Sequence, residues 1–256
     1  MPEPLLDRAA RTAGRVAAYA VVPLALSLLA LDNVAQTAAA RGFHVSVKFA
    51  MPADVATLWT LFDPPASGVH VVAPTSLSLL PVYLVVRAAL AAGYLRGLAD
   101  AARELQPSFS DAVAEHGVSM LGVQVAQFLV ALVVALPLIA GGSVGLALLA
   151  MPVVLFVSYL LWGGPYLVVA RDVDAVTALA WSASLATDGG RYFTFAVGYA
   201  LVAAVASLFV SLVVTGAGLV GVVVAAAVVA YPSLVASAAA THVVDDVAAA
   251  EPTRGA

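Results

Sequence analysis

Three polar side chains lie inside stretches of the sequence that are otherwise almost free of charge. Arg87 precedes Arg96 by nine residues, so in a helix it would lie ~13 Å inside a membrane. An unpaired charge at that depth costs at least ~2.5 kcal/mol. Gln124 and Gln127 stand about one helical turn apart, so both amides can face the same neighbour. This pattern predicts a polar binding site or path formed by Arg87, Gln124 and Gln127.

A structural role is the alternative for each of these residues. The long side chain of Arg87 can extend toward the membrane surface or pair with a group on another helix. Glutamine amides in lipid usually bond across helix interfaces. In the binding role, Arg87 would anchor an anion or a lipid headgroup inside the bundle. The sequence leaves both alternatives open.

Two groups of acidic residues and histidines have spacings found in metal sites. The two groups are His242, Asp245 and Asp246, and Asp111, Glu115 and His116. Each offers three ligands without a fourth at the end of an apolar stretch, so ordinary polar helix ends explain them better. We expect no metal site.

The sequence lacks the motifs of the common catalytic chemistries. It contains no HExxH, no glycine-rich loop before a helix and no Gly-x-Ser-x-Gly elbow. The absence of cysteine excludes disulfides, thiolate zinc sites and thiol catalysis. No cofactor is expected, and nucleic acid is not an expected partner because no basic patch interleaved with aromatic residues occurs.

The composition requires lipid as the solvent for most of the chain. Of 256 residues, 63% are hydrophobic and only 10% are charged, whereas roughly a quarter are charged in soluble domains. The apolar residues fall in blocks of about twenty, which is enough for a helix to cross a ~30 Å hydrocarbon layer. We therefore predict an all-α membrane protein with one polytopic domain over 1–256 and about six transmembrane helices, at 16–31, 76–95, 117–140, 144–162, 193–215 and 219–240.

The segments between these helices are more polar. Apolar and polar residues alternate from Phe43 to Phe49, which is the period of a half-buried strand, so 41–73 is predicted as a small outer cap with short β-strands. The segments 97–116 and 172–188 are predicted as amphipathic helices on the cytoplasmic membrane surface. Glycine turns at 141–143 and 216–218 predict two antiparallel hairpins. Aligning the two halves gives a similar layout, which indicates a parallel internal repeat as one interpretation.

The basic residues predict the orientation. Nearly all would lie on one side of the membrane, against Arg41 and Lys48 on the other. Cytoplasmic segments carry an excess of such residues, so both termini are predicted to be cytoplasmic in a multi-pass protein of the cell membrane. The first apolar stretch, with its basic start and the small residues 38–40, also has the pattern of a cleavable secretory signal.

A resemblance to known proteins rests on one motif and the helix after it. Tyr166–Val169 precede Asp172 and an Ala-Leu-x-x-Ser-x-x-Leu pattern over 178–185. This resembles the membrane domain attached to some glycerophosphodiester phosphodiesterases. The outer segment, with Pro52 and Trp59, looks like that of uncharacterised haloarchaeal six-helix membrane proteins. The resemblance implies a multi-helix membrane fold over nearly the whole chain, and no activity, since the sequence lacks the phosphodiesterase catalytic domain.

These observations predict a non-enzymatic binding or scaffolding component of the cell envelope, with the lipid bilayer and other membrane proteins as its partners. A small-solute or lipid transporter is the alternative, and it would need a polar cavity that reaches Arg87 and Gln127. A membrane-embedded enzyme is the third hypothesis. It would require a set of four side chains to converge at the cytoplasmic face: Asp111, His116, Asp172 and His242.

Overall fold

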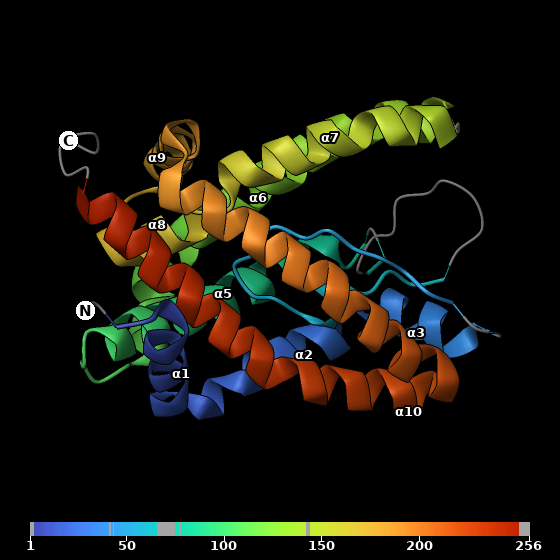
Figure 1. The fold of residues 1–256 in the computed structure, drawn as a ribbon, viewed down its shortest axis with the longest axis horizontal. Helices are drawn as coiled ribbons and strands as arrows, with labels where there is room; N and C mark the ends of the chain where they lie inside the picture. Colours follow the sequence, from blue (N-terminus) through green and yellow to red (C-terminus); the bar gives the residue numbers. More distant parts are fainter. Residues whose placement is uncertain are drawn as a thin grey trace.

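A computed structural model describes residues 3–40, 42, 44–65, 75–76, 78–141 and 144–250. Over these residues the protein is helical, without a β-strand (Figure 1). In chain order the elements are α1 (Leu5–Arg15), the 3₁₀ helix η1 (Ala17–Ala20), α2 (Val21–Leu29), α3 (Leu31–Ala39), α4 (Leu58–Leu61), α5 (Leu80–Ala102), α6 (Phe109–Gly141), α7 (Val144–Leu161), α8 (Gly164–Arg171), α9 (Ala175–Asp188) and α10 (Gly190–Ala250).

The number of long apolar helices confirms the predicted class of all-α membrane protein. Within the described residues, five helical stretches are long and apolar enough to cross a membrane: Leu80–Ala102, Phe109–Val133, Ala150–Arg171, Gly190–Thr215 and Ala217–Ala250. A sixth is reached if α1 and the following Ala17–Leu29, which are bent by 91°, are counted as one span. The chain therefore has five to six candidate spans.

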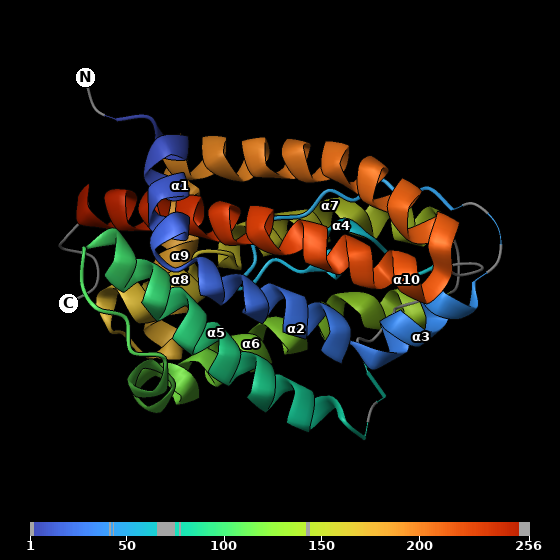
Figure 2. The same ribbon diagram turned by 90° about the horizontal axis from the view of Figure 1, so that it is seen from below.

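The N-terminal region differs from the single helix predicted over 16–31. α1 lies across the end of the bundle, and η1 and α2 then turn by about a right angle to run along it (Figure 2). Val16 interrupts the helix with φ −120° and ψ 35°. The bend separates polar α1, which carries three arginines, from the apolar α2. A second break at Ala30, where ψ is 69°, separates α2 from α3.

α10 is a helical hairpin whose turn falls within the predicted 216–218 segment. Gly218 has φ 56° and ψ −133°, a conformation that residues with a Cβ rarely adopt. A Cβ on Gly221 would lie 2.7 Å from the carbonyl oxygen of Val213, so the two arms approach closely where they meet. The hairpin packs against α1, α2, α3 and α5 and forms one side of the bundle (Figures 1 and 2).

The prediction of a surface helix over 97–116 is wrong. α5 continues through Ala102 and α6 already begins at Phe109, so this segment is divided between two long helices. The reason is that Leu95, Leu98 and Ala101 are buried against the bundle, and this apolar face extends the membrane helix. At the second predicted surface segment, 172–188, the structure has the separate helix α9, whose Asp174 caps the N-terminus by accepting from the backbone N–H groups of residues 176 and 177.

The predicted outer cap with β-strands is also not what the described residues form. Residues 44–57 enter the bundle as an extended, re-entrant segment between α10 and the α6–α7 hairpin (Figure 1). The backbone N–H groups of Ser46 and Lys48 donate to the hydroxyls of Ser211 and Ser207, at 3.2 and 3.1 Å. Two residues of extended chain rise about 6.6 Å and four helical residues about 6 Å, so alternate N–H groups match serines one turn apart. The period-two pattern is therefore that of a segment lying along a helix. Arg41, Phe43 and 66–73 of the predicted cap lie outside the described residues.

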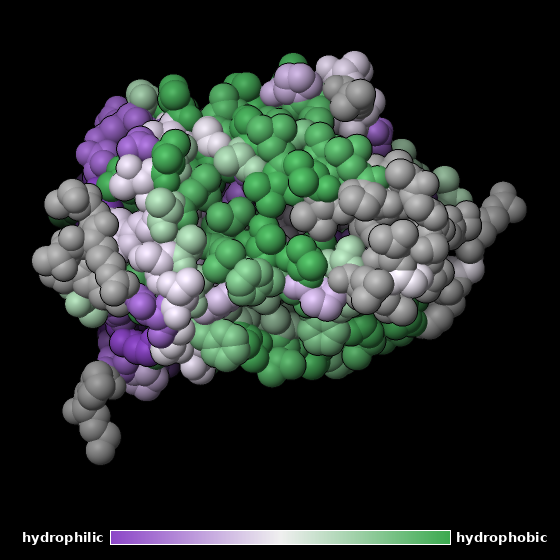
Figure 3. All heavy atoms as spheres, turned by 90° about the horizontal axis from the view of Figure 1, so that it is seen from above, coloured by the Kyte–Doolittle hydropathy of each residue, from purple (hydrophilic) through white to green (hydrophobic). Residues whose placement is uncertain are grey.

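An apolar surface covers the middle of the molecule. Viewed from above, hydrophobic side chains form a broad band, and hydrophilic side chains gather at the end where α1, α8 and α9 lie (Figure 3). Large hydrophobic side chains that are more than half exposed include Leu129 and Val133 of α6, Phe156 of α7 and Phe209 of α10. Such an exposed apolar area is stable where lipid replaces water.

Candidate functional site

The re-entrant segment carries a carboxylate into the interior of the bundle. Asp54 follows Met51, Pro52 and Ala53, and its side chain is only 2% exposed. The hydroxyl of Tyr166 on α8 donates to the backbone carbonyl of Ala53 at 2.7 Å, which fixes the segment next to Asp54. The extended backbone at this depth is tolerated because it is enclosed by protein.

Asp54 forms an ion pair with the intramembrane arginine that the sequence singled out. The Arg87 Nη2 atom lies 2.5 Å from Oδ1 of Asp54, and Arg87 Nε lies 3.3 Å from Oδ2. Gln124 Nε2 donates to the same Oδ2 at 2.7 Å, and the backbone N–H of Val55 donates to Oδ1 at 2.8 Å. The carboxylate thus accepts four hydrogen bonds from α5, α6 and its own segment.

This arrangement explains how the bundle tolerates Arg87. A charge in the hydrocarbon layer is stable only when it is paired or hydrogen-bonded, and Asp54 supplies the opposite charge. The sequence predicts that Arg87 needs a partner but does not identify it, because Asp54 lies in the segment predicted as the outer cap. The available signal was an acidic residue in a stretch without any other charge, Met51–Leu61.

A cavity of about 290 Å³ adjoins the ion pair, and we call it the fork cavity. Its lining residues come from the re-entrant segment, from α5, α6 and α7, and from Trp162 just after α7. Its walls combine an apolar part from α6 and α7 with a few polar side chains. Its lining includes Asp54, Arg87, Gln127, Val154, Ser158 and Trp162.

The polar side chains of the fork cavity are mostly hydrogen-bond donors. Gln127 donates to the carbonyl of Leu161 at 3.1 Å, which is the interhelical bond expected of a glutamine in lipid. Trp162 is 2% exposed and stacks on Tyr192 with ring centroids 4.3 Å apart. Its indole N–H has no hydrogen-bond partner among the described residues. The structure therefore brings Arg87, Gln124 and Gln127 to one region, with Gln124 behind Asp54 and Gln127 at the cavity wall.

A second concentration of charge occupies the end of the bundle that holds α1. Arg8 of α1 makes a bidentate pair with Asp246 at 2.9 and 3.1 Å, and Arg103 and Arg171 both approach Asp245, at 3.2 and 3.1 Å. We call this network the arginine end. His242 lies within it, with Nδ1 3.1 Å from Arg8 Nη2 and Nε2 2.9 Å from the hydroxyl of Thr12. Arginines and a threonine are therefore the partners of three α10 residues: Asp245, Asp246 and His242. These contacts hold α1, the end of α5 and α8 against α10.

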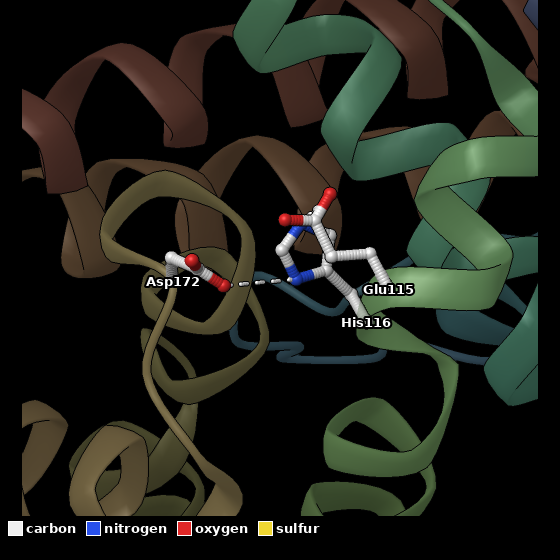
Figure 4. Close-up of side chains that lie close together, drawn as sticks. All are labelled: Glu115, His116 and Asp172. Carbon is white, nitrogen blue, oxygen red and sulfur yellow. Dashed lines mark ion pairs between the residues drawn. The ribbon is translucent and has the colours of Figure 1, made fainter.

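Of the other predicted group, Asp111, Glu115 and His116, the structure brings only the last two together, and Asp172 takes the place of Asp111 beside them. Glu115, His116 and Asp172 place one ligand atom each within 4.8 Å of one another (Figure 4). The His116 Nδ1 atom lies 3.6 Å from Asp172, and Nε2 lies 3.6 Å from Glu115. The guanidinium of Arg96 lies 3.0 Å from the same Nε2. That cation occupies the position from which a metal would bind Nε2, so the cluster is better suited to joining α5, α6 and the α8–α9 connection.

The four side chains required by the enzyme hypothesis fall into separate groups. His116 and Asp172 lie together, whereas His242 belongs to the arginine end. Asp111 makes no hydrogen bond or ion pair with either group among the described residues.

Comparisons with protein-family models, with curated proteins and with solved structures gave no match.

Proposed function

We propose that this protein is an integral membrane component of the cell envelope that binds a small amphiphilic ligand in the fork cavity. The observation that carries the proposal is a buried ion pair in the wall of a cavity of about 290 Å³ within the apolar part of the bundle. Binding sites of this size combine apolar walls with a few placed polar groups. Here the polar groups are Arg87, Gln127 and Ser158, and the apolar wall comes from α6 and α7.

The shape of the site favours a ligand with an apolar part. Val154 of α7 lines the cavity and is 43% exposed, so the cavity wall is not sealed at this residue. A ligand with its head at Arg87 would therefore extend past Val154 toward the lipid. A scaffolding role alone would not require this cavity. The alternative role is transport of the same ligand, which a cavity lined by Arg87 and Gln127 also favours.

We place both termini on the cytoplasmic side. The support is the arginine end, where Arg8, Arg15, Arg103, Arg171 and Arg191 gather beside the described ends of the chain. Membrane proteins retain such residues on the cytoplasmic side. The re-entrant segment then enters from the outside, and the fork cavity opens in the outer part of the membrane.

The test is a pair of matched substitutions on α7. Val154→Trp fills the fork cavity and leaves the ion pair intact, while Val153→Trp adds the same side chain at a neighbouring position that is 49% exposed and outside the lining. The protein is purified in mild detergent, and native mass spectrometry records bound small molecules. We expect a co-purifying amphiphile on the wild type and on Val153→Trp, and its loss from Val154→Trp. Equal occupancy in all three proteins, or none in the wild type after incubation with extracted membrane lipids, would refute the proposal.

A further inference from the structure

Arg87 lines two cavities. Besides the fork cavity, it contributes to a cavity of about 230 Å³ toward the outer end, which we call the Lys48 cavity. The walls of the Lys48 cavity are mostly polar: Asn33, Lys48, Thr57, Trp59, Thr60, Asp63 and Tyr83 are among them. Arg87 is the one residue shared by the described linings of the two cavities. Arg87 therefore lies between the mostly polar Lys48 cavity and the fork cavity, whose walls are largely apolar.

The two partners of the ion pair differ in accessibility. The Arg87 side chain is 32% exposed, whereas that of Asp54 is 2% exposed and is covered by Gln124 and the Val55 backbone. A molecule in the fork cavity can thus reach the cation more easily than the anion. The lining of the fork cavity also includes Ser158, whose hydroxyl can donate a hydrogen bond as the Arg87 guanidinium does. These donors fit the oxygens of an anionic headgroup.

We infer that Arg87 binds the carboxylate or phosphate group of an amphiphile, and that Asp54 takes up one proton from the solvent as this anion binds. The inference rests on the proposed binding function. The ion pair alone is neutral, so an added anion would leave a net negative charge in a region of low dielectric, and two anionic groups would share one guanidinium. Protonation of Asp54 restores neutrality. The protonated carboxyl keeps its place, since it can still accept from Gln124.

The other titratable groups around the pair do not supply this proton. They are Tyr83 and Tyr94 of α5, Tyr166 of α8 and Tyr199 of α10. A tyrosine is already neutral at physiological pH and ionises only near pH 10 in water. Beyond Tyr83 and Arg87, the Lys48 cavity contains the pair formed by Lys48 and Asp63, whose atoms lie 2.5 Å apart. That pair is neutral as a unit and lies outside the contact with Asp54.

Calorimetric titration of the full chain in zwitterionic lipid nanodiscs tests the inference. The probes are laurate, dodecyl phosphate, inorganic phosphate and uncharged dodecanol, each titrated at several pH values in buffers of different ionisation enthalpy. We expect laurate or dodecyl phosphate to bind with an uptake of one proton, so that affinity falls about tenfold for each unit of pH above neutrality. Asp54→Asn should bind the same probe more tightly and with no pH dependence, because Arg87 then lacks its protein counter-ion. Tight binding of inorganic phosphate would instead assign the site to a free anion.

Two controls separate this inference from the proposed function and from misfolding. Glu104→Gln removes a carboxylate at the arginine end and should leave the proton uptake unchanged. Val154→Trp retains the Asp54–Arg87 pair and should abolish binding of both long-chain anions. If the anions bind to the fork cavity but without proton uptake, or if dodecanol binds as well as laurate, the inference fails and the proposed function stands. If Asp54→Asn is poorly folded, thermal stabilisation of the wild type by laurate gives the second readout: stabilisation that does not decrease as pH rises would overturn the inference.

Discussion

The arginine end and the Asp54–Arg87 pair use the same chemical groups in opposite surroundings. At the arginine end, Arg15 and Glu104 pair at 2.7 Å with side chains 45% and 75% exposed. Asp54 pairs with Arg87 at 2.5 Å with its carboxylate almost completely enclosed. Exposed pairs contribute little to stability because water solvates either partner alone, whereas a buried charge depends on its partner. A substitution should therefore have large consequences at the Asp54–Arg87 pair, and a ligand gains most by replacing a partner there.

The largest effect is expected from Asp54→Ala. Removal of one partner of a buried ion pair leaves an uncompensated charge and costs about 3–5 kcal/mol. We expect a large loss of thermal stability, measured by fluorescence-detected size exclusion after heating. The double substitution Asp54→Leu with Arg87→Met, which removes both charges, should recover much of the loss. A double variant as unstable as Asp54→Ala would show that the pair's charge is not the cause.

The sequence predicted the helices better than the site for a physical reason. An apolar stretch of about twenty residues predicts a membrane-spanning helix directly. The energetic cost of a charge in lipid likewise singles out Arg87. The partner of Arg87 could not be found in the same way, since Asp54 is 33 positions away and its burial depends on a segment folding back into the bundle. The alternation of apolar and polar residues before Asp54 predicts a β-strand. The same period of two also fits an extended chain that bonds to serines on a helix, so the pattern alone does not distinguish the two structures. The association of His116 with Asp172 likewise depends on the packing of α6 against α8.

The turn of the α10 hairpin should be the next most sensitive position. A Cβ on Gly221 would meet backbone atoms of Val213 and Val214 at 2.7 and 2.8 Å, and backbone cannot move aside cheaply. We expect Gly221→Ala to cost about 1–3 kcal/mol, measured as a lower melting temperature in detergent. Gly198→Ala is the matched control, since its Cβ would meet nothing within 4 Å. If both glycine variants have the melting temperature of the wild type, the two arms of α10 do not approach as closely at Gly221 as described.

Removal of the two serines that bind the re-entrant segment should have a smaller effect. Ser207→Ala with Ser211→Ala deletes the acceptors of two backbone N–H groups, and each lost hydrogen bond costs about 1 kcal/mol. The N–H groups of 46 and 48 should then exchange faster in hydrogen–deuterium exchange mass spectrometry. Thr215→Val is the control, because Thr215 donates only to the carbonyl of Ser211 within its own helix. Unchanged exchange at 46 and 48 would contradict the proposed anchoring.

The smallest effect is expected at the exposed pair of the arginine end, and it should depend on pH. The hydrogen bond from Arg15 lowers the pKa of Glu104 below its ordinary value. A carboxyl whose pKa is lowered by folding stabilises the protein above its unfolded pKa, and this contribution is lost as pH falls through the folded pKa. Glu104→Gln should therefore melt slightly below the wild type at neutral pH. The difference should shrink once the pH falls below the ordinary glutamate pKa of about 4.3 and vanish below the lowered pKa of the folded protein. Arg15→Gln removes the other partner and should give the same pattern, with no further loss in the double variant. A difference that grows as pH falls would reverse the sign of this linkage and would assign the effect of Glu104 to a contact other than Arg15.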